Sequence, residues 1–396
     1  MKILVLNAGS SSIKYQLIVI PGNQVLAQGL VERIGETQGA VHYQSADHQI
    51  DEEGVIPNHK AGLEKVANLL LDPEKGVLKS AGEIQAVGHR VVHGGSYFVQ
   101  TTIIDDRVKK VIKDLFPLAP LHNPANLAGI EVAEKVFPNA RQVAVFDTAF
   151  HQTIPEVAHR YAIPNKFYEK EHIRLYGFHG TSHQYVSKKA IAYLGNDKAK
   201  FISIHLGNGC SMTAIQDGKS IDHSLGFGPM NGLIMGTRSG DIDQSVVLYL
   251  QQSLGYSAEE VANLLQKKSG MLGLTGSNDL RDIESASAKG DPMAQLALAM
   301  NAYRIKKYIG SYAAIMNGLD ALIFTAGIGE NSAVIRQLVC TDMEFLGIAL
   351  DQEKNKIRSK SIRTIQHPSS KVQILVIPTN EELEIAEQVY MKVKGN

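Results

Sequence analysis

Two segments of the chain share one arrangement, in which small polar residues separate two apolar runs. Residues 3–20 read ILVLNAGSSSIKYQLIVI, and residues 201–215 read FISIHLGNGCSMTAI. A two-residue Asn-Gly turn is enough to join the strands of a hairpin, so both turns hold more donors than the fold requires. Glycines let backbone amides approach an anion closely, and hydroxyls add donors. Either segment alone is better explained as an ordinary turn, but the two together indicate a polyphosphate site.

Strands and helices alternate along the chain, which predicts layered α/β domains. The 396 residues exceed what one core usually supports, and the hairpin occurs twice. We therefore expect a duplicated pair of such domains. Strands are predicted over residues 1–20 as a hairpin, as short strands within 25–56, and over 83–95, 141–151 and 320–331. Helices are predicted over 62–71, 123–137, 181–194, 257–268 and 292–317, and a strand, a turn and a helix over 372–393.

Three local signals mark where helices begin. Asn123 is expected as the N-cap of its helix, with Pro124 at the first helical position. Thr379 and Glu382 have the spacing of a capping box. The segment AGIGENS, residues 326–332, is expected to be a glycine turn that joins a strand to a helix starting near Ser332. Glycines there would let a flat ligand lie against the backbone, and a helix N-terminus favours negative charge.

Charge and composition restrict the classes of partner. Lys and Arg number 40, as do Asp and Glu, so the chain lacks the basic excess of a nucleic-acid-binding protein. No apolar run approaches the length of a membrane span, and the first apolar residues are too few for a signal peptide. The two cysteines form no CxxC motif, which suits a reducing compartment. We expect a cytoplasmic protein with a small-molecule partner.

Several polar residues lie where an anion site would need them. Arg90 and Arg238 have glycine neighbours, and with His179 they form a candidate anion clamp, although a surface ion pair explains either arginine alone. Asp147 and Glu381 each follow a predicted strand, where the strand ends of α/β sheets face a ligand. Their carboxylates suit Mg²⁺, with a first-turn helix acid as the alternative for Glu381.

Other phosphate and metal motifs are missing or unfavourable. The sequence DGKS at 217–220 has Thr213 where a P-loop needs its upstream glycine, and no GxGxxG occurs. His89 and His93 are four residues apart on a predicted strand, a span of about 13 Å that one metal ion cannot bridge. His179 and His183 have the same spacing near a helix start, where hydrogen bonding at an anion site is favoured over zinc chelation.

Nine motifs along the whole chain make it resemble the acetokinase family of acyl-carboxylate kinases. They are NAGSSSIK, HRVVHGG, APLHNPANLAGI, FDTAFHQTIP, YGFHGTSHQYV, HLGNGCS, MGTRSGDID, AGIGENS and IPTNEELEIA. The resemblance places the chain in the superfamily of sugar kinases, actin and heat-shock chaperone ATPases. It implies two duplicated actin-like, ribonuclease H-like domains, 1–149 plus 385–396 and 150–384, with a nucleotide cleft between them. It also implies a homodimer.

The resemblance further implies reversible, direct in-line phosphoryl transfer from MgATP to acetate, giving acetyl phosphate and ADP, with Mn²⁺ as an expected substitute for Mg²⁺. The implied catalytic residues are Asp147, His179 and Arg238. The implied acetate-binding residues are Arg90, Val92, Leu121, His122, Phe178 and Pro229. The implied ATP-binding residues are Ser10, Ser12, Lys14, His205, Leu206, Gly207, Asn208, Gly209, Asp279, Leu280, Arg281, Gly327, Ile328, Gly329, Glu330 and Asn331. Asn7 and Glu381 match the positions associated with magnesium.

Some positions depart from the family pattern or leave alternatives open. Residues 226–233, GFGPMNGL, depart from the family pattern, and Ala326 stands in place of a common glycine. These departures concern the mouth of the cleft and the nucleotide preference. Acetate is already ionised at neutral pH, since carboxylic acids have a pKa of roughly 4, so Asp147 has no proton to remove. We hypothesise that Asp147 orients an arginine or a metal-bound water. Propionate or butyrate kinase, an actin- or chaperone-like ATP switch, and a histidine metallohydrolase are the alternatives.

Overall fold

A computed structural model describes residues 1–395, which form two compact units. The first unit comprises residues 1–152 and 380–395, and the second comprises residues 153–379. The sequence placed the divisions at 149/150 and 384/385. The whole of helix α15 (Glu381–Lys394) belongs to the first unit because its buried residues Ile385 and Val389 pack against strands of that unit.

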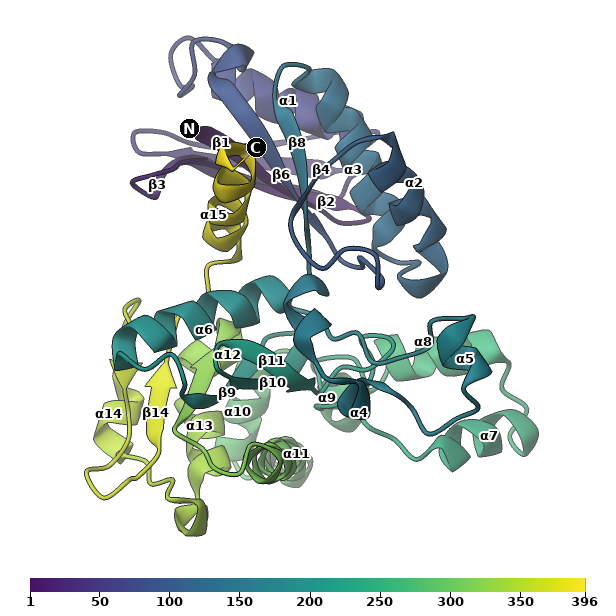
Figure 1. Ribbon diagram of the computed structural model, residues 1–396, viewed down its shortest axis with the longest axis vertical. Coiled ribbons are helices and arrows are strands. Elements are labelled where there is room, and N and C mark those ends of the chain that lie inside the picture. The colour runs from purple at the N-terminus through teal and green to yellow at the C-terminus, as the bar shows by residue number, and fades with distance from the viewer. Residues whose placement is uncertain (396) are drawn as a thin grey trace. The chain divides into compact units, whose positions relative to one another are not determined.

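The first unit is built on an eight-stranded sheet in the order β5-β4-β3-β2-β1-β6-β8-β7 (Figure 1). Strands β1 to β5 form an antiparallel meander, and β6 and β8 continue from β1 in parallel. The strands are β1 (Lys2–Ala8), β2 (Ser12–Val19), β3 (Gln24–Glu32), β4 (Gly39–Ser45), β5 (Gln49–Gly54), β6 (Ile84–Val91), β7 (Thr102–Ile103) and β8 (Arg141–Phe146).

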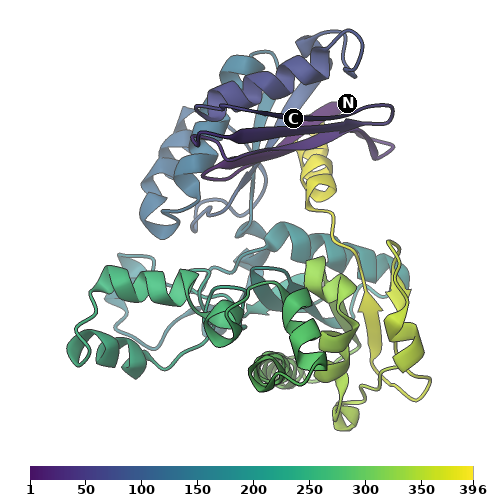
Figure 2. The ribbon, with the colours of Figure 1, turned by 180° about the vertical axis from the view of Figure 1, so that it is seen from behind.

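Helices cover both faces of this sheet (Figure 2). On β1, Leu4 and Leu6 point into the core shared with α1 (His59–Leu71) and α3 (Asn123–Val136), while Ile3 and Val5 point toward α15. A central strand buried on both faces needs apolar residues at nearly every position, which explains the continuous run at the N-terminus. The remaining elements of this unit are α2 (Asp106–Asp114) and the 3-10 turns η1 (Ala81–Glu83), η2 (Phe116–Leu118) and η3 (Ala149–Thr153).

The second unit is built on a six-stranded sheet in the order β11-β10-β9-β12-β14-β13. The strands are β9 (Lys200–Leu206), β10 (Cys210–Gln216), β11 (Lys219–His223), β12 (Ala321–Thr325), β13 (Arg363–Thr364) and β14 (Gln373–Val376). The helices are α4 (Glu156–His159), α5 (Lys166–Glu169), α6 (Gly180–Leu194), α7 (Gln244–Gln252), α8 (Ala258–Lys267), α9 (Gly270–Thr275), α10 (Leu280–Ala288), α11 (Pro292–Ile315), α12 (Ala326–Asn331), α13 (Ala333–Cys340), α14 (Gln352–Lys356) and the 3-10 turn η4 (Glu344–Leu346).

The central five strands of the two sheets have the same topology. In the first unit β3, β2 and β1 are antiparallel neighbours, and β6 and β8 follow in parallel. In the second unit β11, β10 and β9 are antiparallel neighbours, and β12 and β14 follow in parallel. The two glycine-rich hairpins are β1–β2 and β9–β10, so they occupy equivalent places. This equivalence confirms the duplicated α/β domain predicted from the hairpins.

Both predicted caps are wrong, and in both cases the predicted side chain makes a tertiary contact instead. Helix α3 has His122 as its N-cap, because the Asn123 amide exchanges two hydrogen bonds with the backbone of His93. Helix α15 is capped by Asn380, whose Oδ1 accepts from the backbone N–H of Leu383 at 3.0 Å. Capping residues compete with any other group that offers hydrogen bonds.

The glycine turn predicted at residues 326–332 is wrong, whereas the helix predicted to start near Ser332 is confirmed. Residues Ala326–Asn331 form the short helix α12, and Ser332 then caps the next helix, α13, by accepting from Ile335 N–H at 3.0 Å. The sharp change of direction falls on Ala326, which has a φ of 64°. This left-handed conformation is unfavourable for a residue that has a Cβ.

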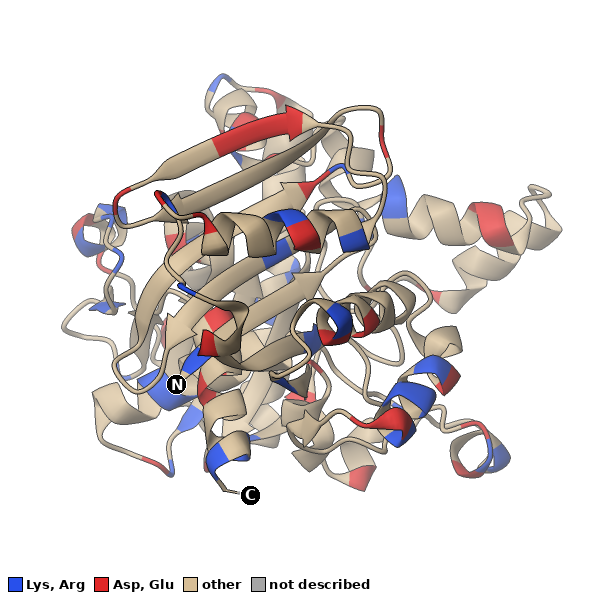
Figure 3. Cartoon of the chain, turned by 90° about the horizontal axis from the view of Figure 1, so that it is seen from above, with Lys and Arg blue, Asp and Glu red and all other residues tan. Residues whose placement is uncertain are grey.

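Charged residues of both signs lie interspersed along the helices, while the edge strand β5 carries a run of acidic residues (Figure 3). Among residues 1–395, no helix combines the length and the hydropathy that a membrane-spanning segment requires.

Candidate active site

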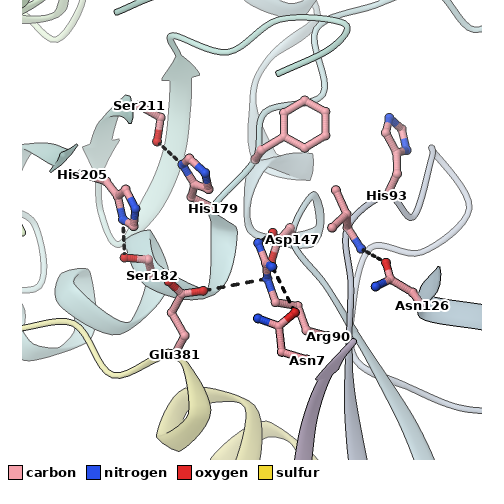
Figure 4. A network of polar contacts seen from close by, with 12 residues as sticks. Asn7, Arg90, His93, Asn126, Asp147, His179, Ser182, His205, Ser211 and Glu381 are labelled. Carbon is pink, nitrogen blue, oxygen red and sulfur yellow. Dashed lines mark hydrogen bonds and ion pairs between the residues drawn. The ribbon is translucent and has the colours of Figure 1, made fainter. Parts of the chain in front are cut away.

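An arginine–aspartate pair lies at the carboxyl ends of two neighbouring parallel strands in the first unit. Arg90 is near the end of β6, and Asp147 directly follows β8. Arg90 Nε donates to Asp147 Oδ1 at 3.0 Å, and Arg90 NH2 donates to Asp147 Oδ2 at 2.5 Å (Figure 4). The Asp147 side chain is 1% exposed and that of Arg90 is 19% exposed. The bidentate geometry fixes the orientation of the guanidinium plane.

Two further oxygen-bearing side chains lie beside this arginine. Asn7, at the end of β1, accepts from Arg90 NH1 through Oδ1 at 3.3 Å, and the Glu381 carboxylate lies 3.9 Å from Arg90 Nε (Figure 4). Burial by itself would lower the pKa of Arg90, but the charges of Asp147 and Glu381 outweigh it and raise that pKa. The first unit thus brings together Asn7, Arg90, Asp147 and Glu381, which are far apart in the sequence.

The segment after β6 carries the first of the predicted acetate-binding residues. Val92 is 7% exposed, and its backbone N–H donates to Asn126 Oδ1 at 3.1 Å. Asn126 Nδ2 in turn donates to the Ala8 carbonyl at 2.7 Å, so one side chain of α3 ties the end of β6 to the end of β1. Leu121 is 54% exposed, and His122 follows it at the N-cap of α3.

The first glycine-rich turn spans residues 9–11. Gly9 N–H donates to the Ser12 carbonyl at 2.8 Å, and the Gly9 carbonyl is held by His59 Nε2 at 2.7 Å. Ser10 is exposed and Ser12 is half-buried. Lys14 on β2 forms an ion pair with Glu382 of α15, with 2.5 Å between Nζ and Oε1. Glu382, which the sequence assigned to a capping box, therefore pairs with a predicted ATP-binding lysine.

The second glycine-rich turn joins β9 to β10. Gly207 N–H donates to the Gly209 carbonyl at 3.1 Å, and Gly236 N–H donates to the Asn208 carbonyl at 3.0 Å. A Cβ on Gly236 would lie 2.0 Å from Asn208 Oδ1, so a side chain at this position would displace the Asn208 amide. The preceding residues His205 and Leu206 are buried.

His179 and Arg238 both approach this second turn. A Cβ placed on Gly209 would lie 3.5 Å from His179 Nε2 and 3.8 Å from Arg238 NH1. His179 is the N-cap of α6 and has a left-handed φ of 57°. Arg238 NH1 donates to the Pro229 carbonyl at 2.9 Å, so this predicted acetate-binding residue contacts a predicted catalytic one. The other predicted acetate-binding residue of this unit, Phe178, is 2% exposed.

The guanidinium of Arg238 has different surroundings from that of Arg90. Across residues 1–395, no carboxylate forms an ion pair with Arg238. Its partial burial lowers its pKa from the ordinary value. A half-buried cation without a counter-ion is costly, and a bound anion would remove that cost. The geometry is therefore that of an anion site formed by a glycine turn, an imidazole and an unpaired guanidinium.

A cavity of about 420 Å³ opens on the outer face of β2 to β5, and a larger one of about 660 Å³ lies in the second unit. The larger cavity contains eight predicted ATP-binding residues, namely Gly207, Asn208, Asp279, Leu280, Arg281, Gly327, Ile328 and Asn331. Within it, Asp279 caps α10 by accepting from Arg281 N–H at 2.9 Å and also pairs with the Arg281 guanidinium. This pairing lowers the pKa of Asp279 to about 2.

Two predicted ATP-binding residues of α12 do not line this cavity. Gly329 is buried, and its carbonyl accepts from Arg336 NH1 at 2.8 Å. Glu330 Oε1 accepts from Thr379 N–H at 3.1 Å, and burial raises the pKa of Glu330. Both residues therefore hold α12 in place.

Four polar residues of the larger cavity were not among the predicted ATP-binding residues: Asn278, Glu284, Ser332 and Arg358. Glu284 lies on α10, and one of its oxygens accepts a short hydrogen bond from the Ser332 hydroxyl of α13. Asn278 precedes the Asp279 motif directly, so inspecting the flanks of that motif would have found it. Arg358 follows α14 in a polar segment that carries no signal of its own.

No group of three or more His, Cys, Asp or Glu side chains with metal-binding geometry occurs within residues 1–395. The Asn7 amide oxygen and the Glu381 carboxylate do suit Mg²⁺, which takes hard oxygen ligands and usually retains several waters. Both oxygens lie beside the guanidinium of Arg90, so the residues present fit an ion held by two protein oxygens, water and a phosphate.

A model of the acetokinase family matches residues 2–387. The chain belongs to the acetokinase family. A protein of Flavobacterium johnsoniae named acetate kinase is 62% identical over 395 residues, covering 100% of both chains.

Two solved structures of the same fold are also similar. The acetate kinase of Porphyromonas gingivalis superposes with a TM-score of 0.94 at 48% identity, covering 99% of both chains. A propionate kinase of Francisella tularensis superposes with a TM-score of 0.92 at 45% identity, covering 98% of both chains. These matches confirm the predicted family and the predicted pair of actin-like α/β domains.

Proposed function

We propose that this chain is an acetate kinase, which transfers the γ-phosphoryl group of MgATP to acetate and releases ADP and acetyl phosphate, reversibly. Membership of the acetokinase family supports a carboxylate acceptor, and relatives named acetate kinase support acetate itself. The observation that carries the proposal is the contrast between the two arginines. Arg90 is held rigidly by Asp147, whereas Arg238 lies beside a glycine turn and forms no ion pair within residues 1–395.

The reaction needs little covalent chemistry from the protein. One acetate oxygen attacks the γ-phosphorus in line, a new P–O bond forms, and the bond to the β-phosphate oxygen breaks with its electron pair leaving on ADP. Acetate is already an anion, so no general base is needed. Catalysis consists of positioning and of stabilising the charge on the moving phosphoryl oxygens. Arg238 and His179 stabilise that charge, and Arg90 binds the acetate carboxylate.

Asp147 acts in this scheme through Arg90. Its two oxygens accept from two different nitrogens of the guanidinium. Arg90 NH1 is the nitrogen that Asp147 leaves for other acceptors, and it donates to Asn7. Asp147 is therefore a positioning residue in our proposal, in agreement with the hypothesis that it orients an arginine.

Asn7 and Glu381 are proposed to hold Mg²⁺, with Mn²⁺ as a substitute. An ion held by these two residues would neutralise negative charge on the phosphate groups of the nucleotide. The 3.9 Å contact between Glu381 and Arg90 links the metal-binding carboxylate to the acetate-binding arginine. The nucleotide is proposed to occupy the cavity lined by the β9–β10 turn, α10 and α12, whose volume of about 660 Å³ suits an adenosine moiety.

Propionate is the second candidate substrate, because a propionate kinase is among the close structural matches. Val92 is expected to limit the acyl group, and it is buried and held by Asn126 through its backbone. One methylene group changes discrimination by only about 1–3 kcal/mol. We expect acetate to be preferred by about tenfold or more in kcat/KM.

A steady-state assay tests the proposal directly. Acetate, propionate and butyrate are offered with MgATP, and the acyl phosphate is trapped as a hydroxamate with hydroxylamine. Acetate-dependent hydroxamate supports the proposal, and a higher kcat/KM for propionate would reassign the substrate. ATP hydrolysis without any acid-dependent hydroxamate would instead indicate a nucleotide switch.

The homodimer is also proposed, on the basis of exposed apolar helices in the second unit. Met293, Leu296, Met300 and Tyr303 recur along one side of α11 and are 37–67% exposed. Helix α7 has no buried residue and exposes Leu248 and Tyr249 by more than half. Large exposed apolar patches mark interaction sites. Light scattering should give twice the 43.1 kDa chain mass, and Met300→Glu with Tyr303→Glu should shift it toward the monomer.

We place the protein in the cytoplasm. Cys210 and Cys340 are both buried free thiols, which agrees with a reducing compartment. Burial raises the pKa of each thiol to about 12, so neither is a reactive thiolate at neutral pH. Cell fractionation with an antibody to the chain tests this placement.

A further inference from the structure

A polar layer is buried between helix α6 and the sheet of the second unit. Ser203 on β9 and Ser211 on β10 are fully buried, and so is His183 on α6. Burying polar groups is costly unless every one of them is hydrogen-bonded. An apolar layer would hold a helix on a sheet at lower cost. The polar residues therefore require an explanation beyond packing.

The layer contains an unbroken chain of hydrogen bonds that ends at His179. Ser203 Oγ lies 2.9 Å from His183 Nδ1, and Ser211 Oγ lies 2.7 Å from His183 Nε2. Ser211 Oγ also lies 2.9 Å from His179 Nδ1 (Figure 4). The three inner members are completely buried, and only His179 is partly exposed. The chain thus leads from the interior to the glycine turn.

The number of protons restricts this chain of hydrogen bonds to two senses, that is, two directions of donation. A hydroxyl has one proton to donate, and a neutral imidazole has one N–H and one acceptor nitrogen. In one sense Ser203 donates to His183 Nδ1, His183 Nε2–H donates to Ser211, and Ser211 donates to His179 Nδ1. His179 then carries its proton on Nε2. In the opposite sense every donor is reversed, and His179 carries its proton on Nδ1.

The position of His179 distinguishes the two senses. Its Cε1–Nε2 edge lies against Gly209, the side that Arg238 also approaches, while Nδ1 faces Ser211. An Nε2 lone pair at an anion site would repel the anion, whereas an Nε2–H would donate to it. We propose that the relay Ser203–His183–Ser211 fixes His179 in the Nε2–H form, so that its donor faces the transferring phosphoryl group. This inference rests on the proposed function.

His223 fixes the position of the same ring through the backbone. Phe178 N–H donates to His223 Nε2 at 3.1 Å, so His223 carries its proton on Nδ1, which donates to Thr213 Oγ1 at 2.7 Å. This bond holds the residue directly before His179, whose left-handed φ sets the direction of its side chain. The relay therefore determines which nitrogen of His179 carries the proton, and His223 determines the position of the His179 ring.

Two kinds of measurement test the relay. The ring-nitrogen NMR shifts of the nucleotide-free protein, assigned with histidine variants, should show Nε2–H in both His179 and His183 and Nδ1–H in His223. Ser211→Ala should lower kcat by about 10- to 100-fold, the range found when the hydrogen-bond partner of a metal-ligating histidine is removed, with the KM for ATP unchanged. Ser211→Thr retains the hydroxyl and should restore most of kcat.

A matched control is available on the same helix. Ser187 is buried one turn after His183, and its hydroxyl has no partner within residues 1–395, so Ser187→Ala should leave kcat unchanged. An Nδ1–H form of His179 or His183 in the wild-type protein would overturn the relay. A kcat of Ser211→Ala within twofold of that of Ser187→Ala would also overturn it. If Ser211→Ala does not fold, the wild-type NMR result decides.

The failure of the proposed function would have a different signature. A wild-type protein that forms no acetate-dependent hydroxamate would refute acetate kinase activity. The ring-nitrogen shifts need neither substrate nor turnover, so they would still establish which sense the hydrogen bonds have.

Discussion

Replacing Asp147 with Asn is the sharpest test of how Arg90, the arginine proposed to bind acetate, is held. The substitution retains the shape of the side chain but removes its charge and turns one acceptor into an N–H donor. That donor would face Arg90 NH2, which now donates to Asp147 Oδ2 at 2.5 Å. The bond from Arg90 Nε to Oδ1, at 3.0 Å, can survive with the amide oxygen as acceptor. The guanidinium would therefore keep one of its two anchors and lose its fixed plane.

The size of the effect follows from these contacts. Arg90 remains 19% exposed, so the side chain has room to shift once one anchor is lost. A shift of about 1 Å in a group that positions a substrate can cost roughly a hundredfold in rate. We expect Asp147→Asn to lower kcat/KM for acetate by about that factor, with a marked rise in the KM for acetate.

A double-mutant cycle determines whether Asp147 acts through Arg90. The hydroxamate assay is run for Asp147→Asn, Arg90→Ala and the double variant, with Glu134→Gln as a control that breaks only the surface pair with Lys109. Residues that act as a unit are non-additive, so Asp147→Asn should cost less than about threefold in the Arg90→Ala background. Full additivity, or an unchanged KM for acetate, would refute the positioning role.

Three other predictions follow from individual environments. Arg238→Ala should lower kcat by about 10³-fold, as for other arginines that stabilise phosphoryl transfer. The melting temperature should not fall, because no carboxylate within residues 1–395 loses an ion-pair partner. A large drop in melting temperature would contradict this prediction. Ala326→Gly should raise the free energy of unfolding by about 1 kcal/mol in urea denaturation by relieving a left-handed φ of 64°, whereas Ala297→Gly within α11 should lower it by a similar amount. Burial lowers the pKa of His89 to about 4, so below the ordinary value of about 6.5 the unfolded chain binds more protons than the folded one. The free energy of unfolding therefore decreases as the pH decreases through that range. From pH 7 to 5 the wild type should lose about 2 kcal/mol more than His89→Gln, and equal losses would contradict the assignment.

The architecture was predictable because its signals are local. A central strand that is buried on both faces reads as a continuous apolar run, and the glycine-rich turns that follow β1 and β9 are visible as sequence. Helix α1 was found from its period, although it begins at His59, three residues before the predicted start. The caps of α3 and α15 were not predictable, because Asn123 bonds to His93 and Glu382 pairs with Lys14, and both partners are distant in the sequence.

The site was predictable in its residue types more than in its contacts. Glycine neighbours singled out Arg90 and Arg238, but nothing local shows that one has a buried carboxylate partner and the other has none. That difference depends on Asp147, 57 residues from Arg90, arriving on the adjacent strand. The sequence assigned Ser211 to the polar turn of the second hairpin and gave Ser203 no role, and only the placement of α6 reveals that Ser211 connects two histidines.

The unequal environments of the two arginines fit the different anions that they are proposed to bind. Arg90 is already neutralised by Asp147 and lies near Glu381, so it offers directed hydrogen bonds with little net attraction. Such a group binds a singly charged carboxylate weakly and in a defined orientation. Arg238 retains its full charge in a partly buried position, where electrostatic interactions are stronger than in water. Its interaction grows as charge develops on the phosphoryl oxygens, and only interactions that strengthen in the transition state accelerate the reaction. An enzyme with the two roles exchanged would bind acetate tightly and transfer phosphate slowly.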